Sequence, residues 1–345
     1  MKVLITGGAG FFGLHMTKKC VAEGEEVTLL DIADYQPDEY DPSVKLVRGD
    51  VRDAAKMDEL IATTDVVIHA AAALPLESRQ EIFSTNVEGT RTCLDLAIKH
   101  KVKRFVFISS TAVYGVPDHH PLYETDERIG VGPYGESKIA AEKLCEAARA
   151  NGLYVTIIRP KTFIGTHRLG VFQILYNWIE EGHKIPVIGD GTNRYQLLEV
   201  SDLCDAVFKA YHHPGSEAND VFNIGCAEFR TVNEDVGALC EYAKSGARVI
   251  HTPVWLVIPV LTLFEALHLS PLYKWVYGTA HKDSFVSIEK AQKVLGWQPR
   301  YSEAEALIRS YQWYLDNKEA IAKESGTTHR VAWKQGILAL FKRIL

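Results

Sequence analysis

The sequence lacks the marks of several specialised classes of protein. It has no Cys-x-x-Cys pair, and its six cysteines are scattered along the chain: Cys20, Cys93, Cys145, Cys204, Cys226 and Cys240. Such scatter predicts buried reduced thiols and argues against a disulfide framework or a zinc site, so we expect no bound metal. No apolar run reaches the ~18–20 residues of a membrane span, since the longest, Val254 to Leu263, is interrupted by Pro259.

Basic residues are fewer than acidic residues in this chain. The chain has 38 lysines and arginines against 44 acidic residues and a net charge of −6, which disfavours nucleic acid as the main partner. Residues Met1–Ile5 already resemble a strand, with no leader-like segment before them. This opening predicts a cytoplasmic protein.

The first 160 residues alternate short apolar runs with helical patterns. Strands are expected at Val3–Thr6, Val27–Asp31, Val44–Val47, Val66–His69, Phe105–Ser109 and Val155–Ile158. Helices are expected between them at Phe12–Glu23, Met57–Ala62, Phe83–Lys99 and Tyr134–Ala150. Strands separated by helices predict an α/β fold of the Rossmann type, a doubly wound parallel sheet covered on both faces.

The pattern changes after Arg159-Pro160. Ile185-Pro186 and Gly189–Gly191 indicate turns, whereas a helix at Asp202–Tyr211 and a strand at Val221–Ile224 are expected to return to the sheet. We therefore expect three parts: a dinucleotide-binding domain of residues 1–165 plus about 196–226, a smaller substrate-binding region of about 166–195 and 227–317, and a C-terminal tail, 318–345.

A glycine-rich turn follows the first expected strand. Gly7, Gly10 and Gly13 open a helix, and together they permit a tight turn, close approach of a pyrophosphate, and close packing of helix on strand. The free N–H groups of the helix start then favour phosphate. Asp31 ends the second strand, where a carboxylate accepts hydrogen bonds from ribose hydroxyls and repels a 2′-phosphate. No arginine follows it in residues 32–34, so NAD is favoured over NADP.

Tyr134 and Lys138 are four residues apart on an expected helix. They would lie side by side, where an ammonium can lower the pKa of a phenol from ~10 toward working pH. Such a pair exchanges protons with an alcohol or a ketone. Alone, the pattern fits a solvated helix face equally well; after a nucleotide-binding turn it indicates catalysis.

Several motifs occur in one order along the chain. They are Gly7-x-x-Gly10-x-x-Gly13, Asp31, Gly49-Asp50-Val51, His69–Ala72, Asn86-Val87, Ser109–Gly115, Tyr134-x-x-x-Lys138 and Arg159-Pro160. Over residues 1 to about 315 the chain resembles the extended short-chain dehydrogenase/reductases, the NAD-dependent epimerase/dehydratase group. The resemblance implies a homodimer and a catalytic set of Ser110, Tyr134 and Lys138. It also implies cofactor contacts from Gly7, Gly10, Phe11, Phe12, Gly13, Asp31, Asp50, Val51, Ala70, Ala71, Asn86, Ser109, Tyr134, Lys138 and Pro160. For Asn86, a helix cap is an equal alternative.

The substrate positions depart from the family pattern. Thr111 and Ala112 stand where the dehydratases carry an Asp-Glu pair, which argues against elimination of water. Thr162 replaces the usual Asn after Arg-Pro. Ala280 stands where an arginine would begin an Arg-x-x-Asp pair, although Asp283 is present. The expected substrate contacts are Thr111, Thr162, Arg168 and Arg194; for both arginines a solvated charge is the alternative.

Two apolar stretches point to a lipid. Residues 252–267 resemble the corresponding part of 3β-hydroxysteroid dehydrogenases, although a buried core helix explains them as well. In the tail, an apolar face that includes Trp333 and Phe341 opposes the basic residues Lys342 and Arg343. This pattern fits a membrane-surface helix, a dimer contact or a lid.

These observations leave two enzymatic hypotheses. The first is an NAD(P)-dependent oxidoreductase that interconverts a secondary alcohol and a ketone on a lipid-like substrate, such as a sterol, a hopanoid or a long-chain 3-keto lipid, in the cytoplasm or on the inner face of a membrane. The alternative is a nucleotide-sugar 4-epimerase with tightly bound NAD. A non-enzymatic protein that senses the cofactor is disfavoured by the complete Ser/Tyr/Lys set.

Overall fold

The computed structural model describes residues 1–267 and 274–321. The chain forms two compact units. The first comprises Met1–Lys161, Val200–Gly225 and Val286–Gln298; the second comprises Thr162–Glu199, Cys226–Phe285 and the chain from Pro299. Segment Val286–Gln298 belongs to the first unit, whereas the sequence interpretation groups it with residues 227–317. The C-terminal tail from residue 322, with its expected apolar and basic faces, lies outside the described residues.

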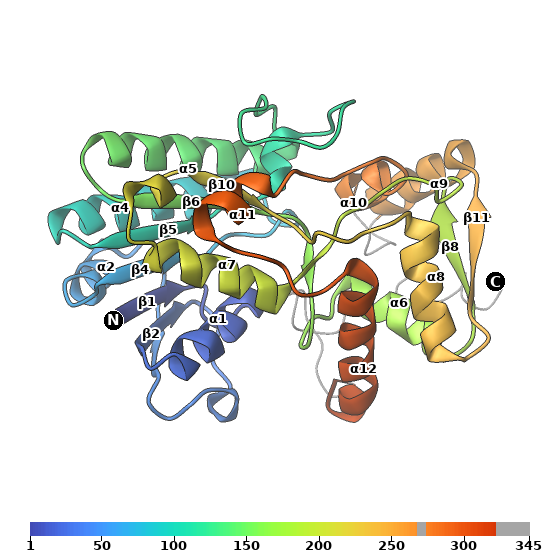
Figure 1. Cartoon of the computed structure of the whole chain (residues 1–345), viewed down its shortest axis with the longest axis horizontal. Helices are drawn as coiled ribbons and strands as arrows, with labels where there is room; N and C mark the ends of the chain where they lie inside the picture. The colour runs from blue at the N-terminus through green and yellow to red at the C-terminus, as the bar shows by residue number, and fades with distance from the viewer. Residues whose placement is uncertain (268–273, 322–345) are drawn as a thin grey trace. The chain divides into compact units, whose positions relative to one another are not determined.

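A seven-stranded parallel sheet forms the centre of the first unit (Figure 1). Its strands are β1 (Lys2–Thr6), β2 (Glu26–Asp31), β3 (Lys45–Arg48), β4 (Val66–His69), β5 (Arg104–Ile108), β6 (Val155–Pro160) and β10 (Val221–Ile224). Their order in the sheet is β10-β6-β5-β4-β1-β2-β3. Strands β2 and β3 extend the sheet on one side of β1, and β4 and the later strands extend it on the other side, so the strand order changes direction between β1 and β4. This parallel sheet confirms the predicted Rossmann-type fold. Its strands are covered on both faces, which explains why they appear in the sequence as continuous apolar runs.

Helices cover both faces of this sheet (Figure 1). On one face, α2 (Ala54–Ile61), α4 (Gly89–Lys99) and α5 (Gly132–Ala150) share a buried apolar cluster with the strands. On the other, α1 (Phe11–Ala22) packs against α7 (Val200–His212). The short α11 (Glu289–Leu295) contacts α7 and β10.

The helix expected at Phe83–Lys99 is interrupted. Its start belongs to α3 (Arg79–Phe83), and a π-helical turn at Ser84–Glu88 separates α3 from α4. The turn places the side chain of Asn86 within hydrogen-bond distance of both the loop after β4 and helix α5. Such wide turns are frequent at functional sites and leave no mark in hydrophobic periodicity.

The second unit combines helices with two small sheets. β8 (Lys184–Ile188) pairs with β11 (Arg248–Thr252), and β7 (Phe163–Ile164) pairs with β9 (Leu198–Glu199). The helices α6 (Val171–Glu180), α8 (Val232–Ala243) and α12 (Glu303–Ile321) enclose an aromatic core around Tyr176 and Tyr311. The turn predicted at Ile185-Pro186 is wrong: Pro186 lies within β8, and a two-stranded sheet tolerates its missing N–H.

Two further helices complete the described chain of the second unit, α9 (Val254–Ala266) and α10 (Lys274–Thr279). Across residues 1–267 and 274–321, no helix combines the length and the hydropathy that crossing a bilayer requires. All six cysteines are buried and free of disulfide bonds.

Candidate active site

The glycine turn between β1 and α1 has no room for side chains. Gly7 has a φ of +75°, and a Cβ on it would lie 2.8 Å from the backbone nitrogen of Ala71. A Cβ on Gly13 would lie 2.3 Å from the Gly7 carbonyl oxygen. Gly10 precedes α1 and supplies no side-chain cap to the start of the helix. This cradle fits the pyrophosphate of a dinucleotide. Phe11 and Phe12, expected beside the cofactor, begin α1 as buried residues.

Asp31 lies beside this turn at the end of β2. Its Oδ2 accepts a hydrogen bond from the Ala9 N–H at 3.0 Å, and its Oδ1 accepts one from Ala33 at 2.9 Å. Arg48 is its register partner on β3; it is exposed and forms an ion pair with Asp34 at 2.7 Å. Arg48 cannot be identified from the residues that directly follow Asp31, because it lies on the next strand, 17 positions later in the sequence. The parallel register of β2 and β3 is the signal that reveals it.

Other expected cofactor residues gather at the ends of neighbouring strands. Asp50 accepts hydrogen bonds from the Arg52 guanidinium at 2.6–3.0 Å, and these bonds lower the pKa of its carboxyl group. Val51 is buried, and a Cβ on Gly89 would lie 2.7 Å from it. The residues after β4 are tied to β1, because the Ala71 N–H donates to Thr6 Oγ1 at 3.2 Å and the Ala70 N–H donates to the Thr6 carbonyl at 3.2 Å.

Asn86 connects the loop after β4 to helix α5. Its Oδ1 accepts from the Ala73 N–H at 2.8 Å, and its Nδ2 donates to Ser137 Oγ at 3.0 Å. The Ser137 hydroxyl in turn donates to the Tyr134 carbonyl at 2.8 Å. Asn86 is 1% exposed and does not cap a helix with its side chain. Its hydrogen bonds instead form a buried chain that ends at the backbone carbonyl of Tyr134.

Tyr134 and Lys138 lie in the first turns of α5. The Lys138 ammonium lies 5.8 Å from the centroid of the Tyr134 ring and donates to the Ile108 carbonyl at 2.9 Å. Tyr134 is half-buried, whereas Lys138 is 2% exposed. Burial lowers the pKa of Lys138 to about 8, while the charge of Glu142 acts in the opposite direction. The Lys138 ammonium and the Tyr134 ring thus lie on the same face of the helix.

Ser110 follows β5, two residues after the carbonyl that holds Lys138. It caps a short 3₁₀ turn, Thr111–Tyr114, and its Oγ accepts from the Ala112 N–H at 3.1 Å. Gly135 permits this turn to pack on α5, because a Cβ there would lie 2.9 Å from the Ala112 carbonyl oxygen. The two packed turns thus bring the segments of Ser110 and Tyr134 together.

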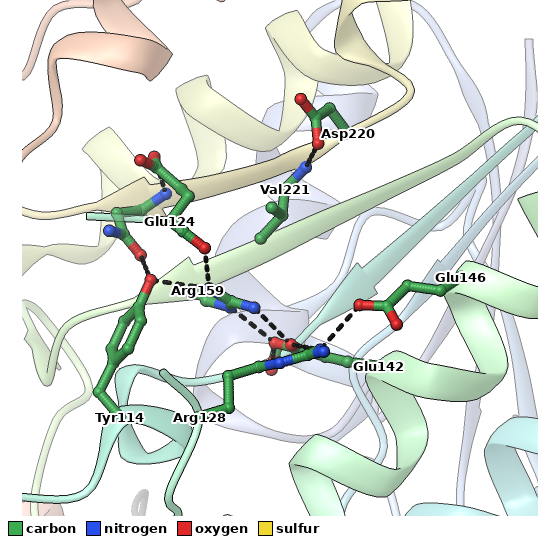
Figure 2. A network of polar contacts seen from close by, with 10 residues as sticks. Tyr114, Glu124, Arg128, Glu142, Glu146, Arg159, Asp220 and Val221 are labelled. Carbon is green, nitrogen blue, oxygen red and sulfur yellow. Dashed lines mark hydrogen bonds and ion pairs between the residues drawn. The ribbon is translucent and has the colours of Figure 1, made fainter. Parts of the chain in front are cut away.

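A buried network of charged residues is centred on Glu142, one turn after Lys138 in α5 (Figure 2). Glu142, fully buried, accepts from Arg159 at 2.6 and 2.8 Å, from Arg128 at 2.9 Å and from the Ser109 hydroxyl at 2.6 Å. Arg159 also donates to the Tyr114 hydroxyl at 2.8 Å. Ser109, expected at the cofactor, thus uses its hydroxyl within this network. Pro160, the next residue after Arg159, is buried at the end of β6.

The four expected substrate residues fall in different units. Thr111 belongs to the 3₁₀ turn of the first unit, whereas Thr162, Arg168 and Arg194 belong to the second. Arg168 is 7% exposed, with its guanidinium 5.7 Å from the Phe172 ring. Arg194 is exposed.

The surroundings of Arg194 are aromatic. Its guanidinium lies 4.5 Å from the Phe229 ring and 4.8 Å from the Phe285 ring, and its backbone N–H donates to Asp283 at 2.8 Å. Among the described ion pairs none includes Arg194. The two phenyl rings were not predicted, because they come from segments far apart in the sequence.

Comparison with known proteins decides the family. The model of the NAD dependent epimerase/dehydratase family matches residues 3–225. This chain belongs to that family. It is therefore an NAD-dependent enzyme of the short-chain dehydrogenase/reductase type, as the resemblance predicts, and NAD is its cofactor.

Relatives within the family cover nearly the whole chain. An uncharacterised Sinorhizobium fredii protein, y4nG, is 36% identical over 98% of this chain and 84% of its own. A dTDP-glucose 4,6-dehydratase of Streptomyces antibioticus is 30% identical over 92% of this chain and 93% of its own. In fold, the chain is similar to the UDP-glucose 4-epimerase of Thermotoga maritima, with a TM-score of 0.77, 24% identity and coverage of 92% and 100%.

Proposed function

We propose that this enzyme interconverts a secondary alcohol and a ketone on the sugar of a nucleotide sugar, with 4-epimerisation as the net reaction. The observation that carries the chemistry is the packing of the Ser110 turn on the Tyr134 turn, with Lys138 buried beside the phenol. The nucleotide-sugar substrate is supported by the named relatives, which act on dTDP-glucose or UDP-glucose.

Each residue of this set has its own role in the reaction. NAD, when bound, supplies a hydride acceptor and donor. Tyr134 takes the proton of the substrate hydroxyl as the ketone forms and returns it when the alcohol is restored. Ser110 donates a hydrogen bond to the same oxygen. The Lys138 ammonium favours the phenolate. Proton transfer of this kind contributes about 10²–10⁴-fold to rate.

Two features bear on the type of reaction and on the substrate. Thr111 and Ala112 provide neither an acid nor a base in the turn after Ser110, which favours epimerisation over the dehydration of the Streptomyces relative. Arg194, exposed between two phenyl rings, is a candidate partner for the diphosphate. It would then supply the cation that Ala280 cannot.

The lipid-like alcohol or ketone is a second candidate, ranked first by the sequence interpretation. One structural observation favours it: helix α9, in the stretch that resembles 3β-hydroxysteroid dehydrogenases, has exposed side chains of Trp255, Leu256 and Leu263. The relatives with named substrates give it no support, so we place it second. A homodimer, also implied by the resemblance, remains a proposal that sedimentation velocity tests.

The deciding experiment is a substrate panel. The enzyme is incubated with UDP-glucose, UDP-galactose and dTDP-glucose, and the products are analysed by nuclear magnetic resonance. A parallel set contains long-chain 3-oxo lipids with NADH or NADPH. We expect the 4-epimer of a nucleotide sugar. Reduction of the lipids with no change in any sugar nucleotide would overturn the proposal in favour of the second candidate.

A further inference from the structure

His69 is fully buried at the carboxyl end of β4 and forms hydrogen bonds with both β1 and helix α4. Its Nδ1 lies 2.7 Å from Thr6 Oγ1 on β1, and its Nε2 lies 3.0 Å from Thr90 Oγ1 on α4. Two further bonds extend this chain. The Ala71 N–H donates to Thr6 Oγ1 at 3.2 Å, and Thr90 Oγ1 donates to the Asn86 carbonyl at 2.7 Å. The imidazole thus connects the loop after β4 to the π-helical turn.

The two ends of this chain fix the direction of every bond in it. A carbonyl oxygen only accepts, so the single hydroxyl proton of Thr90 goes to Asn86, and Thr90 Oγ1 accepts from His69 Nε2–H. A backbone N–H only donates, so Thr6 Oγ1 accepts there and its own proton remains for His69 Nδ1. A neutral imidazole has one donor and one acceptor nitrogen, so these partners select the Nε2–H tautomer. A doubly protonated ring would take from the Thr6 hydroxyl the acceptor that Nδ1 provides.

The other groups around the ring also favour its neutral form. The Phe107 ring is stacked on His69 with centroids 5.9 Å apart, and the Lys138 ammonium lies 4.9 Å from the Phe107 ring. Burial, together with the charge of Lys138, lowers the pKa of His69 to about 3. The Cys93 Sγ lies 3.7 Å from Nδ1 and stays protonated, because burial raises the pKa of this thiol to about 12. No negative charge among these neighbours would compensate a proton on the ring.

Both ends of the chain reach the candidate active site. At one end Ala71 lies against the glycine turn, since a Cβ on Gly7 would lie 2.8 Å from the Ala71 nitrogen. At the other end the Asn86 side chain donates to Ser137, whose hydroxyl donates to the Tyr134 carbonyl. Loss of a hydroxyl in the chain would therefore release backbone that contacts the cradle for the cofactor.

We propose that His69 is a positioning residue for NAD: as the neutral Nε2–H tautomer, it holds the loop after β4 where the glycine turn requires it. The ring acts only through its two hydroxyl partners and exchanges no proton during the reaction. A loop that is already ordered does not have to be ordered by the arriving cofactor, which favours binding. The inference concerns the cofactor alone, so it does not depend on which substrate the enzyme takes.

Nuclear magnetic resonance of the imidazole nitrogens tests the tautomer. The full chain carries isotope-labelled histidine, and the resonances of His69 are identified by their absence in His69→Gln or His69→Phe. With NAD bound, we expect a proton on Nε2, none on Nδ1, and no titration between about pH 5 and 8. A proton on Nδ1, or a ring that titrates in this range, would overturn the proposal.

Paired valine and serine variants test the positioning. Thr6→Val and Thr90→Val keep the branched shape and remove the hydroxyl, and we expect each to weaken NAD binding at least about tenfold in calorimetry. Thr6→Ser and Thr90→Ser keep the hydroxyl and should bind NAD like the wild type. The matched control is Thr156→Val on β6, whose buried hydroxyl donates to the Ala218 carbonyl at 2.6 Å, outside this chain of bonds. It should lose stability and keep its NAD affinity.

Two results of the calorimetry would overturn the proposal. Unchanged NAD affinity in either Thr6→Val or Thr90→Val would show that the chain of bonds serves stability alone. An equal loss of affinity in Thr156→Val would show that NAD binding follows stability and not the position of the loop. No nucleotide sugar enters these experiments, so their failure is distinguishable from failure of the proposed reaction.

Discussion

Glu142 and Arg159 form a bidentate pair inside the first unit, with Arg159 Nε 2.8 Å from Oε1 and a terminal nitrogen 2.6 Å from Oε2 (Figure 2). Glu142 follows Lys138 by one turn of α5, and Arg159 lies on β6. The pair therefore links the helix that carries the candidate catalytic residues to the sheet. Both side chains are at most 3% exposed, so neither charge has water to replace its partner.

Removing the carboxylate should destabilise the fold. Glu142→Gln leaves the Arg159 guanidinium buried with a neutral partner, and breaking a buried pair typically costs about 3–5 kcal/mol. Denaturant unfolding at neutral pH measures this loss. Glu146→Gln, which removes a half-exposed carboxylate from the same helix and the same Arg128, is the control and should cost under about 1 kcal/mol.

The loss should depend on pH. Burial alone would raise the pKa of Glu142, but the hydrogen bonds and charge of Arg159, with Ser109 and Arg128, outweigh it and hold the pKa below its usual value. A lowered pKa in the folded state stabilises above the unfolded value of ~4.3, and the benefit disappears as pH falls through the folded value. The difference in unfolding free energy between wild type and Glu142→Gln should thus shrink on acidification. A constant difference would contradict this account.

Lys138 should set the alkaline limb of the activity profile. Its ammonium, with a pKa of about 8, deprotonates as pH rises, and the phenolate of Tyr134 then loses its neighbouring charge. We expect kcat/KM to decline above about that pH. In Glu142→Gln the limb should move to lower pH, because the negative charge that raises the pKa of Lys138 is gone. An unmoved limb would show that Glu142 acts on stability alone.

Gly135 is required for the contact between the Ser110 and Tyr134 turns. Gly135→Ala places a methyl group 2.9 Å from the Ala112 carbonyl oxygen, so one of the turns must shift. We expect kcat to fall at least about tenfold, since small displacements in a site of this kind have large effects on rate. Gly237→Ala in α8 is the control: apart from its chain neighbours and the backbone of its own helix, no atom of the described residues lies within 4 Å of the added methyl group, and helix propensity predicts a small gain in stability. Equal activity of both variants would contradict the assigned geometry.

Asp31 should govern the preference for NAD. Asp31→Ser removes the carboxylate that repels a 2′-phosphate, while Arg48 on the adjacent strand remains available to pair with it. We expect KM for NADP to drop about tenfold, the equivalent of ~1.4 kcal/mol. The gain should disappear in Asp31→Ser with Arg48→Ala. Initial rates with both cofactors measure the effect, and a gain that survives loss of Arg48 would remove the role given to that arginine.

The sequence predicted what local patterns determine and missed what tertiary packing creates. All seven sheet strands follow from continuous apolar runs, and the glycine turn and the Tyr134–Lys138 pair follow from fixed spacings. Strand β8 was missed because Pro186 indicates a turn unless a two-stranded sheet is known to be present. The Glu142–Arg159 pair was missed because the two residues meet only when α5 packs on β6.

We propose that Tyr134 transfers the proton of a nucleotide sugar while NAD is bound above the glycine turn. The most direct measurement compares wild type and Tyr134→Phe in the interconversion of UDP-glucose and UDP-galactose, with NAD affinity determined by calorimetry on both proteins. We predict a loss of turnover of about 10²–10⁴-fold with NAD affinity nearly unchanged. Retention of turnover by Tyr134→Phe, or a wild type that converts neither sugar, would contradict the claim.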